Sequence, residues 1–241
     1  MNNLPEIYFE RVNDKNIFCR FSKSGNSKKL IIMCHGFRGS SLGPARTFEN
    51  FTGILINNGF SVFRFDQPGS GHSDGDFKDS SFNEWINTLS YFVQKFAGIG
   101  YEIALLGQSM GATVSIIVAA SFQVQIKCLL LWVPDPKSDF QGSFEKIYEE
   151  EGEKYKGSFW QEAKNSDFFA CLKQINQPIH LVYGQTDKYI SPVLKEKVIQ
   201  EVTDKKQPTL ILPGEDHSKW SYETTQKVYD VEVEFLKAQF Y

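Results

Sequence analysis

The sequence has few cysteines and no pair of them in the Cys-x-x-Cys spacing of a zinc or redox motif. The four cysteines lie far apart, and three of them fall in apolar runs typical of strands: Cys19, Cys34, Cys128 and Cys171. We interpret them as buried free thiols. The sequence therefore predicts neither a disulfide framework nor a metal site.

The sequence also has no long basic run and no long apolar run. No basic run accompanies the net charge of −3, which disfavours a nucleic-acid partner. No apolar run approaches the roughly 20 residues needed to span a bilayer. Residues 1–11 are polar and interrupted by Pro5, unlike a secretory signal peptide. We therefore expect a cytoplasmic protein without a membrane span.

Hydrophobic and aromatic residues are plentiful, at 41% and 15% of 241 residues. Such a chain folds around a sizeable core and is long enough for one large domain with an insertion. Short strand-like runs alternate with helical patterns, which predicts an α/β fold: a mostly parallel central sheet covered by helices on both faces. The expected strands are 7–9, 17–21, 30–34, 60–65, 103–106, 126–133, 179–183 and 209–212, and the expected helices 48–57, 82–96, 112–120, 193–202 and 224–240.

This alternation stops after the sixth strand. Residues 137–176 are charged and aromatic, and we expect them to be an insertion of short helices, which the resemblance given below identifies as a small helical cap. The predicted core is then 1–136 and 177–241.

The segment Gly107-Gln108-Ser109-Met110-Gly111 lies between an expected strand and an expected helix. A serine flanked by glycines at such a turn predicts a nucleophile elbow, which presents the hydroxyl above the sheet. A serine hydroxyl needs a histidine as base and a carboxylate to orient that histidine.

Only four histidines are available. His180 lies inside a strand, which favours a structural role, and His35 ends an earlier strand. His217 follows the last strand in a loop, at the same sheet edge as the elbow. We therefore predict His217 as the base.

Asp187, after the strand 179–183, fits the position of the acid in chain order. Asp135 is the rival acid, and Asp216 is a weaker candidate because it adjoins His217. Two backbone N–H groups should stabilise the oxyanion, and Met110 at the helix start and Phe37 in His35-Gly36-Phe37 are placed to supply them.

Taken together, these segments resemble the α/β-hydrolase superfamily, specifically its capped serine hydrolases, which include monoglyceride lipases, cinnamoyl and feruloyl esterases and serine aminopeptidases. The other segments that carry the resemblance are Asp66 to Ser73, Gly184 to Asp187 with Ile190-Ser191-Pro192, and Gly214 to His217. The resemblance implies a Ser109, Asp187 and His217 triad, oxyanion donors at Phe37 and Met110, no catalytic role for His72, and hydrolysis of a small-molecule ester without a cofactor.

The cap is expected to select the acyl group of the substrate. This group is expected to be small to medium in size, with an aromatic acyl group as one possibility. Candidate substrate-binding residues are Arg38, Phe144, Tyr148, Phe159 and Trp160, although the aromatic ones could equally form the cap's own core. A thioesterase, an amidase or aminopeptidase, and a non-catalytic binding scaffold stay open as alternatives. The oligomeric state is open as well, a homodimer included.

Overall fold

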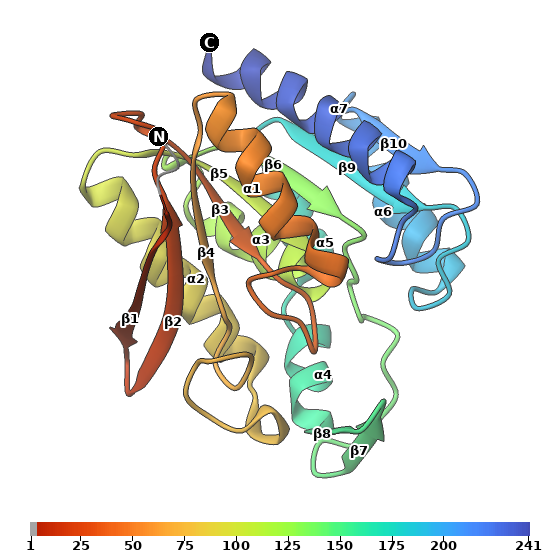
Figure 1. Cartoon of the computed structure of the whole chain (residues 1–241). Helices are drawn as coiled ribbons and strands as arrows, with labels where there is room; N and C mark the ends of the chain where they lie inside the picture. Colours follow the sequence, from red (N-terminus) through yellow and green to blue (C-terminus); the bar gives the residue numbers. More distant parts are fainter. Residues whose placement is uncertain (1–3) are drawn as a thin grey trace.

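A central sheet of eight strands organises the protein, for which a computed structural model describes residues 4–241 (Figure 1). The strand order is β1-β2-β4-β3-β5-β6-β9-β10. Only β2 runs against its neighbours, and all other pairings in this sheet are parallel. The strands are β1 (Glu6–Val12), β2 (Lys15–Ser22), β3 (Lys29–Cys34), β4 (Ser61–Phe65), β5 (Glu102–Gln108), β6 (Ile126–Trp132), β9 (Ile179–Gly184) and β10 (Thr209–Leu212).

Helices cover both faces of the sheet. The helices α1 (Thr47–Asn57) and α7 (Tyr222–Phe240) contact each other on one face (Figure 1). On the opposite face, contacts link α2 (Phe82–Gly98), α3 (Met110–Ser121), α5 (Phe168–Gln174) and α6 (Pro192–Asp204). Two short 3-10 helices, η1 (Pro44–Arg46) and η2 (Phe77–Asp79), lie in the loops.

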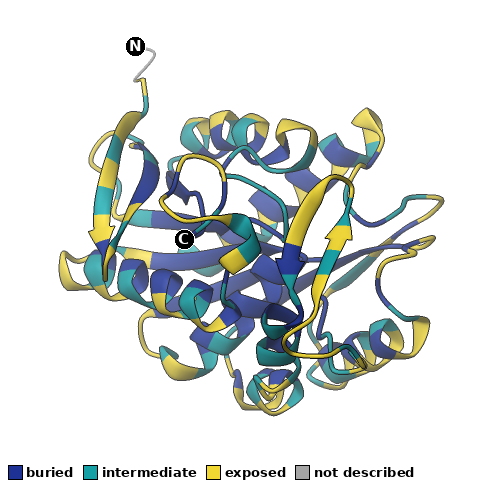
Figure 2. Ribbon diagram, turned by 90° about the horizontal axis from the view of Figure 1, so that it is seen from below, coloured by how far each residue is buried: buried dark blue, intermediate teal, exposed yellow. Residues whose placement is uncertain are grey.

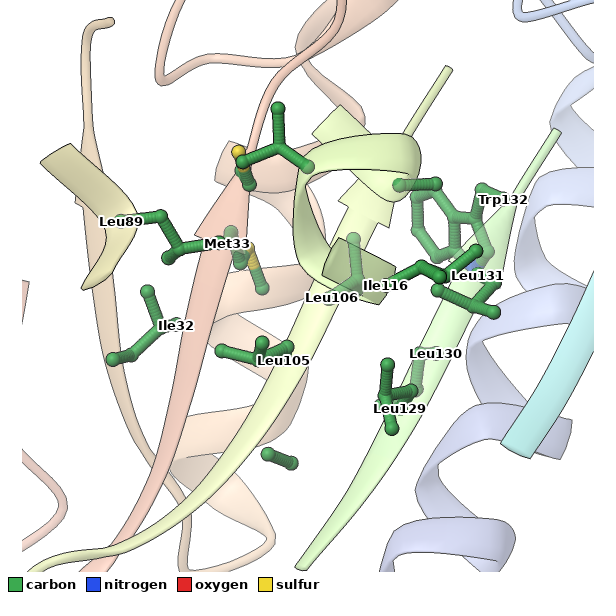
Figure 3. Close-up of a cluster of buried hydrophobic side chains, with 14 of the residues drawn as sticks. Ile32, Met33, Leu89, Leu105, Leu106, Ile116, Leu129, Leu130, Leu131 and Trp132 are labelled. Atoms are coloured by element: carbon green, nitrogen blue, oxygen red, sulfur yellow. The ribbon is translucent and has the colours of Figure 1, made fainter. Parts of the chain in front are cut away.

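The central strands are apolar on both faces because helices cover both. Ile32, Met33, Leu105, Leu106 and the run Leu129 to Trp132 are buried, and Figure 3 shows them packed between neighbouring strands and helices. Figure 2 shows the same arrangement for the whole chain, with the sheet dark blue between helices whose outer faces are exposed. This core holds rigid the sheet edge at which the candidate site lies.

The predicted α/β architecture is confirmed, and the element limits differ from the expected ones by a few residues. The four cysteines are free, three of them buried. Within residues 4–241, no helix is both long and apolar enough to cross a membrane.

The inserted segment was predicted to contain only short helices, but it also contains strands. Its first part is an antiparallel hairpin, β7 (Ile147–Glu150) and β8 (Glu153–Lys156), and helices follow at α4 (Gly157–Lys164) and α5. Glu151 and Gly152 both have positive φ, the pattern of a two-residue type I′ turn. Tyr148 and Tyr155 stack directly across the hairpin with ring centroids 5.7 Å apart. The many Glu and Lys residues of this segment have high helix propensity, so the alternation of side chains that is typical of a strand is difficult to recognise in the sequence.

The two halves of the insertion also lie in different places. The hairpin contacts η2, and α4 contacts α2 and β8, whereas α5 packs against α3 and α6 in the helical layer beneath the sheet. Only the first half therefore borders the pocket described below.

Candidate active site

Ser109 stands at a strained turn between β5 and α3. Its φ of 55° and ψ of −123° are a conformation that residues with a side chain rarely adopt. The turn is held because the Ser109 N–H donates to the Trp132 carbonyl at 2.8 Å, and the Ser109 carbonyl accepts from Ala112 at 2.9 Å. The strained backbone directs the hydroxyl above the carboxyl ends of the strands.

The two glycines of the elbow are required by close backbone approach. A Cβ at Gly107 would lie 2.4 Å from the Ala112 Cα, and one at Gly111 would lie 2.1 Å from the Cys34 carbonyl oxygen. Only glycine lets α3 start this close to the end of β3.

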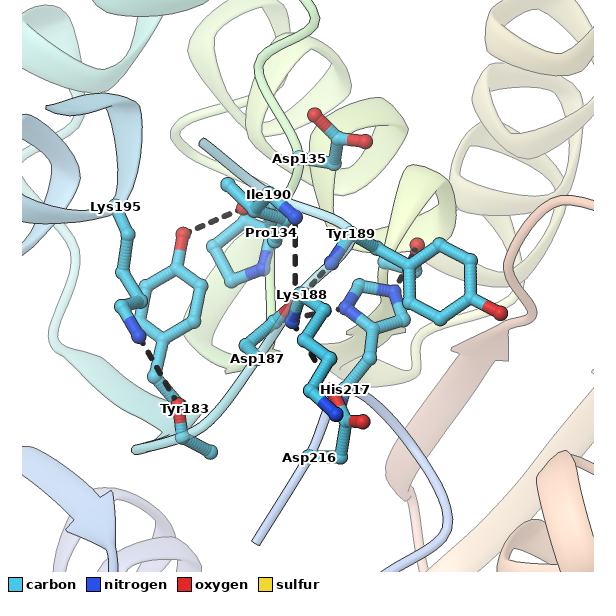
Figure 4. Close-up of polar contacts among 12 residues, drawn as sticks. Pro134, Asp135, Tyr183, Asp187, Lys188, Tyr189, Ile190, Lys195, Asp216 and His217 are labelled. Atoms are coloured by element: carbon cyan, nitrogen blue, oxygen red, sulfur yellow. Dashed lines mark hydrogen bonds and ion pairs between the residues drawn. The ribbon is translucent and has the colours of Figure 1, made fainter. Parts of the chain in front are cut away.

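His217 reaches Ser109 from the loop between β10 and α7. Its Nε2 lies 2.9 Å from the Ser109 Oγ, and its Nδ1 lies 2.8 Å from Asp187 Oδ2 (Figure 4). All three residues are buried, at 8–9% exposure. The structure thus brings together the serine, base and acid that the sequence predicts, in a relay of hydrogen bonds.

The Asp187 carboxylate is held ionised. Burial raises the pKa of such a group, but the hydrogen bond and charge of His217 and the N–H donors of Tyr189 and Ile190 outweigh it, so the pKa of Asp187 lies below its ordinary value. A carboxylate that stays charged can fix the imidazole tautomer with Nε2 free to accept the serine proton.

The two rival acids do not touch the imidazole. Asp135 binds Lys137 instead, with the ammonium 3.0 Å from its Oδ2, and burial raises the pKa of Asp135. Asp216 Oδ1 accepts the backbone N–H groups of His217 and Lys188. Asp216 therefore shapes the loop that carries His217.

The turn from Gly36 to Gly39 lies against the elbow. It is closed by the Gly39 N–H donating to the Gly36 carbonyl at 3.0 Å, and Arg38 at its third position has a φ of 56°. A Cβ at Gly36 would lie 2.9 Å from the Ser109 Cβ. The Gly36–Phe37 peptide is therefore adjacent to the serine, and Met110, the residue after the serine, opens α3.

Above the serine is a pocket of about 690 Å³. Of the five predicted substrate-binding residues, Arg38, Tyr148 and Trp160 line it. The other lining residues come from the loops at the carboxyl ends of the strands and from the insertion: Phe37, Gly39, Ser40, Gly43, Pro44, Gln108, Ser109, Asp135, Lys137, Phe140, Glu150, Glu151, Tyr155, Tyr189, His217, Ser218 and Lys219.

Two predicted substrate-binding residues lie elsewhere. Phe144 is 49% exposed and outside the pocket lining. Phe159 is fully buried and packs on Phe37 and Trp85, at ring centroid distances of 4.9 and 5.0 Å. Phe159 and Trp160 are consecutive in α4 and so point in different directions, and the sequence does not tell which one faces the pocket.

Sequence reasoning did not assign four aromatic side chains to the pocket wall: Phe37, Phe140, Tyr155 and Tyr189. The Phe37 ring packs on Trp160 at 4.3 Å and on Tyr155 at 5.0 Å, which joins the turn to the insertion. Tyr189 lies beside the His217 ring at 5.2 Å and is half exposed. The sequence signal that could have indicated the hairpin is the placement of Tyr148 and Tyr155 on either side of Glu151-Gly152, a dipeptide suited to a tight turn.

The remaining histidines have other partners. His35 is buried, which lowers its pKa, and its Nε2 accepts the Gln67 N–H. His180 Nδ1 lies 2.8 Å from Glu232, and His72 is exposed against Phe18. In the part of the chain that the structure describes, no cluster of three or more His, Cys, Asp or Glu side chains is arranged to hold a metal ion.

The fold and the elbow define the class of this protein: it has the α/β-hydrolase fold, with a serine at the nucleophile position. Residues 25–146, just over half of the chain, match the family model of serine aminopeptidase S33, and the chain belongs to that family. Human monoglyceride lipase is 30% identical over 135 residues, which are 52% of this chain and 43% of that protein. Rat monoglyceride lipase is 31% identical over 122 residues, 49% of this chain and 39% of that protein. The matches thus span less than half the length of these relatives.

Solved structures show the same fold over nearly the whole chain. Est1E from Butyrivibrio proteoclasticus with bound ferulic acid superposes with a TM-score of 0.84 at 21% identity, covering 96% of this chain and 98% of that one. A soluble variant of monoglyceride lipase from Saccharomyces cerevisiae, in complex with a substrate analog, superposes with a TM-score of 0.81 at 15% identity, covering 99% and 96%.

Proposed function

We propose that the protein is a serine hydrolase that cleaves a carboxylic ester through an acyl-enzyme on Ser109. The observation that carries the proposal is the hydrogen-bonded series from the Ser109 Oγ through His217 to Asp187, built on a strained elbow beneath an open pocket. Strain at a buried serine with such partners is a feature of catalytic sites rather than of structural ones.

In the first half-reaction, the Ser109 Oγ attacks the ester carbonyl carbon while His217 Nε2 accepts the hydroxyl proton. The tetrahedral intermediate carries its negative charge on the former carbonyl oxygen, which the N–H groups of Phe37 and Met110 stabilise. As the carbon–oxygen bond breaks, the imidazolium returns its proton to the leaving alcohol, and Asp187 stabilises that imidazolium throughout.

In the second half-reaction, water attacks the acyl-enzyme and gives its proton to His217 Nε2. Collapse of the second intermediate releases the carboxylic acid, and the proton returns to Ser109. Every proton in the cycle moves between Ser109, His217, water and the leaving group, so the proposed reaction uses no cofactor.

The insertion is proposed to be a cap that selects the acyl group. Four aromatic residues of the insertion line the pocket together with Phe37: Phe140, Tyr148, Tyr155 and Trp160. These rings suit an acyl group of small to medium size, aromatic ones included. That Est1E holds ferulic acid within the same fold is in keeping with this substrate class.

An aminopeptidase or amidase on the same triad is the second candidate, because the matched family model is that of a serine aminopeptidase. An aminopeptidase must bind a substrate ammonium through a free carboxylate. The pocket carboxylates are already engaged, Asp135 with Lys137 and both Glu150 and Glu151 with Arg38. This pairing favours an ester over an aminoacyl substrate.

A fluorophosphonate probe and three substrate panels test the proposal. We expect wild-type protein, but not Ser109→Ala, to be labelled and to hydrolyse p-nitrophenyl esters faster than acyl-CoA thioesters or aminoacyl anilides. Turnover of the anilides alone would replace the esterase with the amidase. A folded wild-type protein whose Ser109 stays unlabelled would favour a non-catalytic scaffold. The cytoplasmic location and the homodimer stay predictions from the sequence.

A further inference from the structure

Arg38 connects two parts of the pocket wall that are far apart in the sequence. Its guanidinium donates to the Glu150 carbonyl at 3.0 Å and lies 3.3 Å from a carboxylate oxygen of Glu150 and of Glu151. Glu150 ends β7, and Glu151 begins the tip of the β7–β8 hairpin. The planar fork of arginine suits such a divided set of acceptors better than a lysine ammonium does.

The other end of this connection is the turn that carries the Phe37 N–H. Arg38 occupies the third position of the turn, in the left-handed region at a φ of 56°, where a residue with a Cβ is disfavoured. Its side chain is only 17% exposed despite its length and charge. The neighbouring Phe37 ring packs on Tyr155 and Trp160, so the turn and the hairpin meet through two consecutive side chains.

Among the described residues, the other polar contacts of the hairpin lie away from the turn. Lys156 pairs with Asp79 in η2, and the Gly157 N–H donates to the Lys146 carbonyl within the insertion itself. Neither contact reaches the turn. Arg38 is therefore the polar group through which the position of the hairpin tip is transmitted to the backbone beside Ser109.

The geometry points to Arg38 as a positioning residue that holds the hairpin tip over the pocket and fixes the orientation of the Phe37 N–H at the same time. The inference rests on the proposed function, because that N–H matters only where an oxyanion forms. An oxyanion donor must be oriented before charge develops, so loosening this turn lowers kcat, whereas weaker hairpin contacts alone change KM. The Arg38 guanidinium does not touch the reacting atoms.

Hydrogen exchange and kinetics together test this inference, with p-nitrophenyl butyrate as the substrate. In Arg38→Ala we expect amide exchange to be about three- to tenfold faster both in 147–156 and in 36–40, since partly exposed charged contacts are lost. We expect kcat to fall about tenfold while KM changes less than about threefold. Arg38→Lys should be intermediate, because one ammonium cannot reach all three acceptors.

Lys156→Ala is the matched control, because it removes an ion pair of the same hairpin on the side away from the pocket. Here exchange should rise in 147–156 only, and kcat should stay within about twofold of the wild-type value. The double variant Glu150→Gln, Glu151→Gln should reproduce the Arg38→Ala pattern in weaker form, since the Glu150 carbonyl still accepts a hydrogen bond.

Unchanged exchange in 36–40 in Arg38→Ala would overturn the inference, as would equal kcat values for Arg38→Ala and Lys156→Ala. If wild-type protein turns over no ester, the proposed function fails separately. The exchange in 36–40 then still decides whether Arg38 orders the turn.

Discussion

Replacing Gly111 with alanine tests the close approach of α3 to β3 on which the elbow depends. The new Cβ would lie 2.1 Å from the Cys34 carbonyl oxygen and 2.5 Å from that of His35. Both obstacles are backbone atoms at the end of a central strand, so no side chain can rotate away. The start of α3 must instead move outward by about 1 Å to restore ordinary contact distances.

The magnitude follows from two opposing effects. Overpacking of a rigid core costs about 3 kcal/mol or more, and the greater helix propensity of alanine returns about 1 kcal/mol. We therefore expect Gly111→Ala to lose at least about 2 kcal/mol, or about 4–8 °C in Tm for a chain of this length. The same outward movement separates Ser109 from the Gly36–Phe37 peptide and should slow fluorophosphonate labelling about 100-fold.

Gly53 provides the matched control. It is exposed in α1, and a Cβ there meets no atom within 4 Å. Gly53→Ala should therefore raise the stability by about 1 kcal/mol, with labelling at the wild-type rate. Thermal denaturation followed by circular dichroism gives the Tm of both variants, and the time course of fluorophosphonate labelling gives their labelling rates. Equal Tm changes in the two variants, or wild-type labelling of Gly111→Ala, would refute the close approach described here.

Three further substitutions test buried carboxyl groups, two of them at the site and one beneath the sheet edge. Asp187→Asn should lower kcat about 10⁴-fold through the wrong imidazole tautomer and Asp135→Asn less than about tenfold, so the reverse order in steady-state kinetics would make Asp135 the acid. Burial raises the pKa of Asp135 in the folded state, so between the folded and unfolded pKa values the native state binds more protons than the unfolded state. This carboxyl therefore makes the free energy of unfolding fall as pH rises. Urea titrations from pH 4 to 8 should show that this fall with pH is smaller in Asp135→Asn than in the wild type. Glu232→Ala should cost about 3–5 kcal/mol in urea unfolding, since Glu232 is fully buried between the Trp132 indole and His180; a loss under about 1 kcal/mol would show that this pair is not structural.

The meeting of Ser109, His217 and Asp187 could be predicted because the signals are local and because the carboxyl ends of the parallel strands share one edge of the sheet. The elbow needs only five consecutive residues, and its glycines reflect backbone contacts within the same turn and with the end of β3. Asp187 and His217 each follow a parallel strand, and parallel strands bring their carboxyl ends to the same edge. The sequence could not show whether Asp187 or Asp135 contacts His217, because this depends on the direction in which each carboxylate points.

The pocket wall was less predictable because its contacts are distant in sequence and its local signals conflict. Arg38 and Glu150 are 112 positions apart, and nothing in either neighbourhood indicates the other. The hairpin residues have helical propensity, and their period of two spans only four residues in each strand. Cross-strand stacking and contact with Phe37 decide the structure there, and such tertiary contacts override propensity.

Catalytic groups and pocket wall are also held in different ways, and this separates the chemistry from the choice of substrate. Hydrogen bonds to backbone groups hold the segments that carry Ser109 and Asp187: the Ser109 N–H donates to the Trp132 carbonyl, and the Asp187 carboxylate accepts two backbone N–H groups of its own loop. The hairpin is attached to the core mainly by side chains, through Arg38, Lys156 and the aromatic contacts of Phe37. Segments attached in this way open at lower free energy than a sheet edge does. If the hairpin selects the acyl group as proposed, substitutions in it should change which acyl groups enter while the hydrogen bonds from Ser109 to Asp187 stay intact, as long as the contact of Arg38 with Glu150 and Glu151 is kept.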